Sequence, residues 1–244
     1  MKINEIYLGD CLELMPKFVD DKSVDMIFCD LPYGTTACKW DTIIPFDKLW
    51  SEYERIIKDN GAIVLFGAEP FSSALRMSNI KRYKYDWVWK KNNVTGFANA
   101  KKMPLKNIEN ISVFYKKLPT YNPQGLIKID KNHKNSISHK TNKDEGISTI
   151  NGGRFKDGYK QEYTNYPRQI LEYNRPSKTL HRTQKPLALI EYMIKTYTNE
   201  GDLILDNTCG SGTTGLGAKN LNRNYIMMEQ DPKYYEIACK RAQG

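Results

Sequence analysis

The chain has 244 residues, of which 40% are hydrophobic and 27% charged, and its net charge is +9. No apolar stretch approaches the roughly 20 residues that a membrane-spanning helix needs, and the first residues lack the apolar core of a signal peptide. Its five scattered cysteines form no CxxC pair, which argues against a disulfide framework or a zinc site. We therefore expect a cytoplasmic protein with no metal and no membrane segment.

Strand-like and helix-like segments alternate over residues 1–117. Apolar runs predict strands at residues 4–10, 24–30, 61–67, 85–91 and 110–117. Helical periodicity predicts helices at residues 11–18, 46–61 and 70–79, with Asn60–Gly61 as the end of the second. Alternation of this kind is typical of a parallel sheet with helices on both faces.

Residues 118–180 lack this alternation and are rich in Asn, Lys, Gly, Ser and Thr. So long an irregular stretch in a compact domain is usually functional or disordered. Residues 81–185, which include it, contain 23 Lys and Arg but 8 Asp and Glu. Such a region indicates a polyanion-binding surface, with a solvated lysine-rich loop as the alternative. Its interleaved tyrosines favour nucleic acid, because aromatic rings stack on bases.

The α/β pattern resumes after residue 180. It predicts helices at residues 186–198, 212–222 and 232–242 and strands at residues 202–209 and 224–231. Between the first of these strands and its helix, Gly210, Gly212 and Gly215 form a G-x-G-x-x-G pattern, and Glu229 ends the next strand. This arrangement matches a dinucleotide-binding fingerprint, and a glycine-rich turn without a ligand is the alternative.

Two features of the glycine loop argue against NAD. Asp206 ends the preceding strand, where its charge would repel a pyrophosphate but attract the ammonium and sulfonium of S-adenosylmethionine. Only about 30 residues follow Gly212, too few to complete a doubly wound sheet. Residues 1–117 must supply the remaining strands, so the chain is permuted relative to an ordinary Rossmann enzyme.

Residues 30–34, with the sequence DLPYG, follow the predicted strand at 24–30. An acid, a proline and a tyrosine together exceed the needs of a turn, since Asn-Gly or Asp-Gly would suffice. Considered alone, the motif fits a strand-ending turn with a buried tyrosine. Its position before the glycine loop in the chain gives it a second interpretation.

With DLPYG early and the glycine loop late, the sequence resembles the amino-methylating DNA methyltransferases in the permuted arrangement called the beta group. The resemblance covers nearly the whole chain except residues 118–165. It rests on five blocks in the family's order, GDCLELM (9–15), DLPYG (30–34), HRTQKP (181–186), DNTCGSGTT (206–214) and MMEQDPKYYEIA (227–238). The chain departs from the family motifs at Leu31, Arg182 and Asn207–Thr208, where the family has proline, proline and Pro-Phe.

The resemblance implies an α/β fold with a doubly wound, seven-stranded, Rossmann-like sheet. The implied strand order is 3-2-1-4-5-7-6 with strand 7 antiparallel, circularly permuted and interrupted by a target-recognition region. We expect residues 1–117 to form the catalytic half of the methyltransferase domain and residues 181–244 its cofactor-binding half. Residues 118–180 are the expected basic target-recognition region.

The resemblance also implies the catalytic roles. Two acceptors aimed at an exocyclic base amine would localise its lone pair and accommodate the charge that grows during attack on the sulfonium methyl. The Asp30 carboxylate is one predicted acceptor and the Leu31 backbone carbonyl the other. Pro32 would hold that carbonyl in place, which explains how leucine can replace proline at position 31. Tyr33 would stack on a base swung out of the duplex.

The candidate cofactor-binding residues are taken from the same motifs. They are Asp10, Cys11, Asp30, Thr183, Lys185, Asp206, Gly210, Ser211, Gly212, Thr213 and Glu229. Asp206 is assigned to the ammonium side and Glu229 to the ribose. Cys11 fits a small core residue equally well. His181, Thr183 and Lys185 could line the methionine carboxylate or cap the following helix, and Phe66 is expected in the core.

The expected partner is double-stranded DNA. Two further partners stay open, a cognate restriction endonuclease and a second copy of the chain in a dimer. The candidate DNA contacts are Phe97, Arg154, Lys156, Lys160, Tyr166, Arg168 and Arg175, most of them to phosphate. Permuted family members with Asp in the catalytic motif mostly act on adenine, and those with Ser on cytosine. Asp30 therefore favours the N6 amine of adenine, with the N4 amine of cytosine as the alternative.

Other classes of function stay open at this point. The glycine loop with Glu229 alone would also suit an NAD-dependent oxidoreductase. A catalytically inactive DNA-binding protein is a second alternative. The chain retains the catalytic-motif residues and the loop glycines, which argues against this loss of activity; these residues are Asp30, Pro32, Tyr33, Gly210, Gly212 and Gly215. RNA or a protein side chain is a third possible acceptor, because the basic segment does not distinguish RNA from DNA.

Overall fold

A computed structural model describes residues 1–35, 41–133, 159–175 and 184–243. The chain divides into two compact units, one made of residues 1–122 and 168–244 and the other of residues 123–167. The second unit contains a two-stranded antiparallel sheet of β6 (Ile127–His133) and β7 (Tyr159–Thr164). Each unit is described by itself below.

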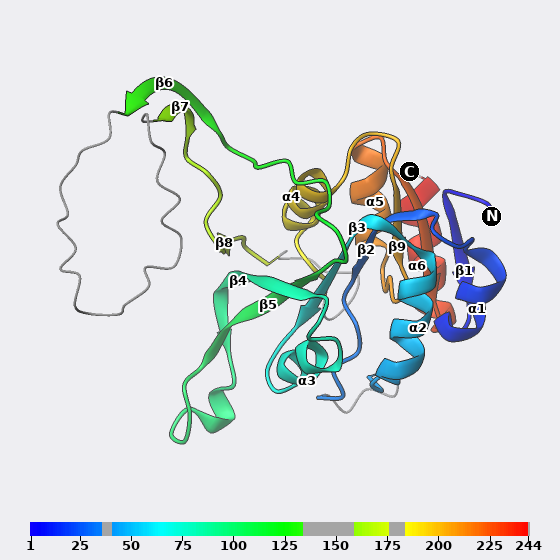
Figure 1. Ribbon diagram of the computed structural model, residues 1–244. Helices are drawn as coiled ribbons and strands as arrows, with labels where there is room; N and C mark the ends of the chain where they lie inside the picture. Colours follow the sequence, from blue (N-terminus) through cyan, green and yellow to red (C-terminus); the bar gives the residue numbers. More distant parts are fainter. Residues whose placement is uncertain (36–40, 134–158, 176–183, 244) are drawn as a thin grey trace. The chain divides into compact units, whose positions relative to one another are not determined.

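The larger unit is built on one eight-stranded sheet in the order β1-β10-β9-β2-β3-β5-β4-β8 (Figure 1). Its strands are β1 (Glu5–Leu8), β10 (Asn224–Glu229), β9 (Leu203–Asp206), β2 (Val24–Cys29), β3 (Ile57–Gly67), β5 (Lys106–Phe114), β4 (Tyr83–Thr95) and β8 (Ile170–Glu172). The first seven reproduce the expected order 3-2-1-4-5-7-6. β5 runs antiparallel to both of its neighbours, as expected for strand 7. The predicted fold class is confirmed.

Helices cover both faces of this sheet, because the strands are apolar on both sides. Met26 and Phe28 of β2 belong to one core, and Ile27 and Cys29 belong to the other. The first face packs against α4 (Leu187–Tyr197), α5 (Thr213–Asn220) and α6 (Pro232–Gln243). The second packs against α1 (Cys11–Phe18), α2 (Phe46–Ile56) and α3 (Phe71–Ser78). This is the doubly wound arrangement that the alternating pattern predicts.

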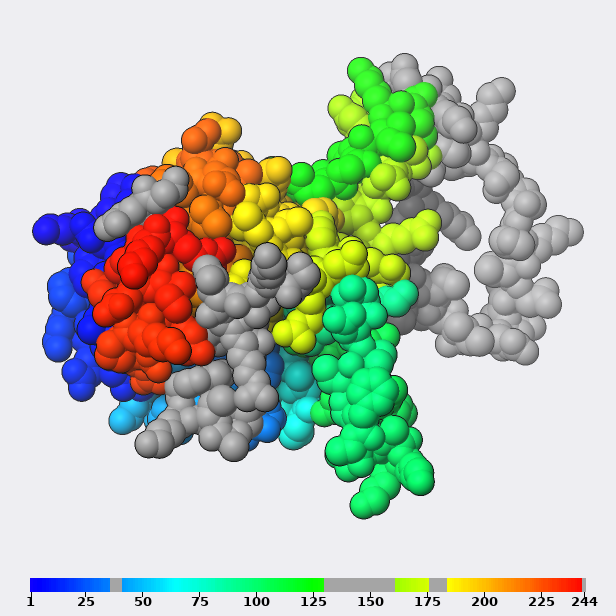
Figure 2. Space-filling model, turned by 180° about the vertical axis from the view of Figure 1, so that it is seen from behind, coloured from blue at the N-terminus to red at the C-terminus, as the bar shows by residue number. Residues whose placement is uncertain are grey.

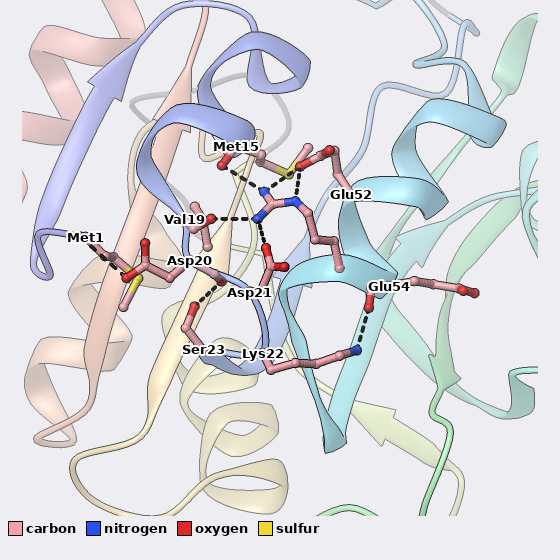
Figure 3. A network of polar contacts seen from close by, with 10 residues as sticks. Met1, Met15, Val19, Asp20, Asp21, Lys22, Ser23, Glu52 and Glu54 are labelled. Carbon is pink, nitrogen blue, oxygen red and sulfur yellow. Dashed lines mark hydrogen bonds and ion pairs between the residues drawn. The ribbon is translucent and has the colours of Figure 1, made fainter.

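One arginine ties α1 to α2 (Figure 3). Arg55, in the last turn of α2, donates hydrogen bonds to the backbone carbonyls of Met15 at 3.1 Å and Val19 at 2.9 Å. It also pairs with Asp21 and Glu52, each at 2.6 Å. The Met15 and Val19 carbonyls at the end of α1 thereby share a charged donor from α2, which joins the two helices.

The boundary between α2 and β3 differs from the prediction. The helix ends at Ile56 and the strand begins at Ile57, which pairs with Val24. Gly61 lies inside β3, next to a shift in the pairing register with β2. A Cβ there would lie 2.8 Å from the Asp25 carbonyl oxygen. Gly61 therefore permits close approach of two strands and does not end a helix.

The described residues of the region predicted to lack regular structure include three strands. β6 and β7 lie in the second unit, and β8 adds an eighth strand beside β4 at the sheet edge. β8 has three residues, and its side chains alternate between exposed and buried. So short a strand forms because a neighbouring edge supplies hydrogen-bond partners, which local sequence does not reveal. In the described part of the chain, no helix is long and apolar enough to cross a membrane.

A long hairpin formed by β4 and β5 projects from the sheet. Both views show its tip extending well beyond the helices (Figures 1 and 2). Its tip contains the short 3-10 helix η1 (Phe97–Asn99). β4 runs parallel to β3, since both are antiparallel to β5. The tip therefore extends from the edge of the sheet at which the carboxyl ends of the parallel strands lie.

Candidate active site

A cavity of about 310 Å³ opens at the carboxyl ends of the neighbouring strands β2 and β9. This is the place where open α/β sheets bind ligands, because loops from adjacent parallel strands converge there. Most of the residues predicted from the motifs line it. They are Asp10, Cys11, Asp30, Leu31, Pro32, Tyr33, Lys185, Asp206, Gly210, Ser211, Thr213 and Glu229. The predicted Thr183 lies outside the described residues.

The glycine loop joins β9 to α5 through a left-handed turn. Gly212 has a φ of 75°, and a Cβ at this position would lie 3.0 Å from Ala238 of α6. Arg241 of the same helix donates hydrogen bonds to the carbonyl of Ser211 at 2.8 Å and to the Thr213 hydroxyl at 3.1 Å. The loop therefore packs closely on α6, and its shape is fixed by that contact. Gly212 supports the loop from behind and is the predicted loop residue that does not line the cavity.

Asp206 is a buried carboxylate at the end of β9. Its side chain accepts a hydrogen bond from the Thr208 backbone N–H at 3.1 Å. Burial raises the pKa of Asp206 to about 7, although hydrogen bonds from Thr214 and Thr208 oppose the shift. Within the described part of the chain, no lysine or arginine pairs with this carboxylate. A buried carboxylate without a cationic partner can pair with a cationic group of a ligand, which would favour its ionised form.

Glu229 links the end of β10 to the glycine loop. One carboxylate oxygen accepts from the Gly210 backbone N–H and the other from the Asp231 backbone N–H, both at 2.8 Å. Burial raises the pKa of Glu229, and these hydrogen bonds oppose the shift. Each carboxylate oxygen has a second lone pair. The side chain can therefore accept hydroxyl groups of a sugar while it holds the loop.

Asp10 and Cys11 begin α1 at the rim of the cavity. The Asp10 side chain caps the helix by accepting the Leu12 backbone N–H at 2.8 Å. Cys11 is buried, and its sulfur accepts a hydrogen bond from the Asn207 side chain at 3.3 Å. Cys11 is therefore both a core residue and part of the cavity wall.

The departures at positions 207 and 208 form buried polar contacts. The Asn207 side-chain oxygen accepts from the Tyr53 hydroxyl at 2.6 Å and from the Cys29 thiol at 2.9 Å. The Thr208 hydroxyl donates to the Asp30 backbone carbonyl at 3.2 Å. These two residues join the glycine loop to α2 and to the DLPYG motif. The sequence marked them as departures but did not reveal these partners.

The DLPYG motif holds its side chains against the cavity. The Tyr33 hydroxyl donates to one oxygen of the Asp30 carboxylate at 2.6 Å, and its ring stacks on Phe71 with 4.9 Å between centroids. Burial and the charge of Asp30 raise the pKa of Tyr33, so its hydroxyl stays protonated. The Asp41 carboxylate accepts the Gly34 backbone N–H at 2.8 Å and closes the turn. Because Phe71 covers one face of the Tyr33 ring, a base can stack only on the other.

Lys185 has partners that the sequence did not predict. Its ammonium bonds the second oxygen of Asp30 and lies 3.4 Å from an oxygen of Glu109. It also lies 4.9 Å from the centroid of the Phe66 ring. Burial opposes the charged form of Lys185, but the two carboxylates outweigh it and raise its pKa. Lys185 therefore contacts the DLPYG motif and not the start of α4.

Glu109 and Phe66 are among the cavity residues that were not predicted as site residues. Glu109 of β5 lines the cavity, and its only signal in the sequence is an acid at the start of an apolar strand. Phe66 was expected in the core, and it is buried but also lines the cavity. Both residues stand on the strands of the far half of the sheet. Only the pairing of β3 with β5 brings them to the same wall.

The predicted DNA contacts described in the larger unit, Phe97, Arg168 and Arg175, do not line the cavity. Phe97, at the tip of the β4–β5 hairpin, is 68% exposed, and Arg168 is exposed in the same unit. The backbone N–H of Arg175 donates to the Asn92 side chain at 3.2 Å. Tyr166, which is 57% exposed, and Lys160 of β7 belong to the second unit. Two further predicted contacts, Arg154 and Lys156, lie outside the described residues, as does His181.

Comparison with known proteins agrees with this geometry. A family model described as DNA methylase, of the N6/N4 type, matches residues 24–240. The type II methyltransferase M2.MboI of Moraxella bovis is 29% identical, over 97% of this chain and 86% of that protein. The crystal structure of an M1.HpyAVI–SAM complex has a TM-score of 0.65 and 27% identity, covering 97% of this chain and 98% of that one. PvuII DNA methyltransferase (cytosine-N4-specific) shares the fold, with a TM-score of 0.70 and 16% identity over 97% of this chain and 85% of its own. The chain therefore belongs to the N6/N4 DNA methylase family.

Proposed function

We propose that this chain transfers a methyl group from S-adenosylmethionine to the N6 amine of adenine in double-stranded DNA, after the base has been flipped out of the helix. The coarser assignment, a DNA methyltransferase that uses S-adenosylmethionine, follows from the family and decides against an NAD-dependent oxidoreductase. The observation that carries the proposed chemistry at a base amine is the placement of Asp30. Its carboxylate lines the same cavity as the glycine loop.

The cavity residues fit the cofactor. Asp206 supplies a buried negative charge without a cationic partner among the described side chains, and Glu229 supplies acceptors beside the glycine loop. We assign Asp206 to the ammonium and Glu229 to the ribose hydroxyls. When bound, the cofactor supplies an electrophilic methyl group on sulfur. Asp10 and Cys11, which line the cavity at the start of α1, are assigned to the side of the adenine moiety.

The chain's own residues orient the base amine. Asp30 and the Leu31 carbonyl accept its two hydrogens, which localises the nitrogen lone pair. Both oxygens of Asp30 already accept one donor each, Tyr33 and Lys185. A carboxylate offers about four acceptor positions, so the amine can bind without displacing either donor. We assign Asp30 to orientation of the amine, because the amine becomes acidic only once it is methylated.

Adenine is preferred to cytosine because the motif contains Asp and not Ser at position 30. Both bases carry an amine beside a ring nitrogen, so the same acceptors can serve either. DNA from a methylation-free host that expresses the chain should contain N6-methyladenine within one short sequence context. Sequencing with direct detection of modified bases tests this. N4-methylcytosine as the only product would contradict the adenine assignment, and unmodified DNA would contradict the enzymatic one.

The catalytic assignment of Asp30 has its own test. We expect Asp30→Ala to abolish methyl transfer and to leave cofactor binding largely intact, because the carboxylate acts on the amine. Methyl transfer is measured with tritiated cofactor, and cofactor binding by calorimetry. Glu229→Gln is the matched comparison, in which cofactor binding should fall first. Equal losses of binding and activity in Asp30→Ala would assign Asp30 to the cofactor instead.

We assign DNA recognition to the basic region at residues 118–180, together with the β4–β5 hairpin. Support comes from the composition of that region and from exposed aromatic and basic side chains such as Phe97, Tyr166 and Arg168. Exposed rings offer stacking faces for bases, and basic side chains pair with phosphate. Arg168→Ala should reduce the slope of log K for DNA binding against log salt concentration by about one, because one counterion fewer is released. An unchanged slope would exclude a phosphate contact there.

A further inference from the structure

Four charged side chains of alternating sign form a row, and three of them, Glu109, Lys185 and Asp30, line the cavity. Lys91 of β4 bonds one oxygen of Glu109, and the ammonium of Lys185 lies 3.4 Å from the other. Lys185 in turn bonds Asp30. The row thus runs from the base of the β4–β5 hairpin to the DLPYG motif, across three separate segments of the chain.

The inner members of this row are buried to an unusual degree for charged groups. The Lys185 side chain is 7% exposed, and that of Glu109 is 13% exposed. The Glu109 oxygen nearest Lys185 is inaccessible to solvent and accepts no hydrogen bond. Its contact with Lys185 is therefore purely that of an ion pair. Buried pairs of this kind rarely add stability over apolar side chains of similar size, so a role in the site explains them better than a role in folding.

Aromatic rings limit the freedom of both lysines. The Lys185 ammonium lies 4.9 Å from the Phe66 ring centroid, and the Lys91 ammonium lies 5.0 Å from that of Trp89. Cations are attracted to such ring faces. The Lys185 ammonium is therefore held by two carboxylates and one ring, those of Glu109, Asp30 and Phe66.

We infer that Glu109 and Lys185 are positioning residues for Asp30, an inference that rests on the proposed function. Glu109 holds Lys185, and Lys185 holds one oxygen of the Asp30 carboxylate, while Tyr33 holds the other at 2.6 Å. The carboxylate is therefore held by two donors, one on each oxygen, at a position that lines the cavity. Neither Glu109 nor Lys185 needs to touch the reacting atoms.

The test compares Glu109→Gln with a matched control, Asp86→Asn. Asp86 is a buried carboxylate on β4, with Ser112 and Tyr83 as hydrogen-bond partners, and it does not line the cavity. We expect Glu109→Gln to lower the single-turnover rate of methyl transfer about 10- to 100-fold, as small misplacements of catalytic groups do. The Kd for cofactor should not change, and Tm should shift no more than in the control. Asp86→Asn should retain the wild-type rate.

A second measurement does not depend on activity. In a crystal structure of Glu109→Gln we expect the Lys185 ammonium to leave Asp30 and the Asp30 carboxylate to rotate.

The double variant tests the same contact by rate. Adding Lys185→Met to Glu109→Gln should lower the rate of methyl transfer little further, since both changes remove the same contact. An unchanged rate in Glu109→Gln, or an equal loss in Asp86→Asn, would overturn the inference while leaving the proposed function intact. A wild-type protein that methylates no DNA would overturn both.

Discussion

The pH dependence of cofactor binding should report the ionisation of Asp206. Burial raises the pKa of this carboxyl to about 7, so the free protein is partly protonated at neutral pH. The ammonium of the cofactor pairs only with the ionised form. Binding should therefore release a proton below pH 7, and cofactor affinity should fall as the pH is lowered.

The size of the effect follows from the ionised fraction. With a pKa of about 7, that fraction falls from roughly 0.8 at pH 7.5 to roughly 0.1 at pH 6, so the Kd should rise about eightfold, or about 1.2 kcal/mol. Below pH 6 the slope should approach tenfold per pH unit. The range stops short of pH 8, where an ordinary α-amino group such as the cofactor's has lost about half of its proton.

Isothermal titration calorimetry in two buffers of different ionisation heat measures both the Kd and the released proton. Asp206→Asn should bind weakly at every pH and lose the slope, and Glu229→Gln should bind weakly but keep it. A wild-type Kd that is flat between pH 6 and 7.5 would refute the assignment. An unchanged slope in Asp206→Asn would do the same, because another group would then be titrating.

The same pKa predicts a trend in stability. Between about pH 4 and pH 7 the folded protein retains a proton on Asp206 that the unfolded chain has lost. The contribution of this group to the unfolding free energy therefore decreases as the pH rises through that window, and it stays unfavourable above pH 7. Asp206→Asn should remove this decrease, as urea unfolding at pH 5 and pH 7.5 would show.

Three other substitutions test single features of the fold and surface. Gly212→Ala should lower the unfolding free energy by more than the roughly 1–2 kcal/mol that a left-handed alanine costs, because its Cβ would also lie 3.0 Å from α6. Gly201→Ala is the control for backbone strain alone, since Gly201 has a φ of 85° and no neighbour within 4 Å. Equal losses of unfolding free energy in the two variants, measured by urea unfolding, would exclude the clash. Arg55→Ala should cost about 1.5–3 kcal/mol, the range for hydrogen bonds to charged groups, and a loss below 0.5 kcal/mol would show that α1 and α2 are held by apolar packing alone. Phe97→Ala should weaken DNA binding in fluorescence anisotropy at fixed salt without changing cofactor affinity, whereas Met77→Ala, equally exposed on α3, should leave DNA binding unchanged.

Strand order was predictable through the family resemblance that the order of the motifs carries. The apolar runs located the seven principal strands, and the early DLPYG and late glycine loop indicated a permuted sheet. Asp30 and Asp206 both end strands, so their placement at one edge follows from parallel pairing of β2 with β9. Asp206 and Glu229 could therefore be named as candidates before any side chain was placed.

Boundaries and long-range contacts were less predictable. Asn60–Gly61 has the signature of a helix end, but pairing with β2 draws Ile57 to Gly67 into a strand. Tertiary pairing outweighs local propensity there. β8, with three residues, leaves no periodic signal at all. The roles of the residues that line the cavity and of the basic region at 118–180 stay predictions.

By itself, the sequence indicated an α/β fold and the positions of two loops at strand ends, because both are encoded in short periodic segments and in motifs a few residues long. The order of the sheet came from the family resemblance that those motifs carry. Only the tertiary structure decided what surrounds Asp30. Glu109 and Lys185 are 76 residues apart in the chain, and no local pattern relates them. Their pairing depends on burial, since two charges withdrawn from water must find partners nearby. That requirement is met only once β5 and the start of α4 are packed against the same cavity.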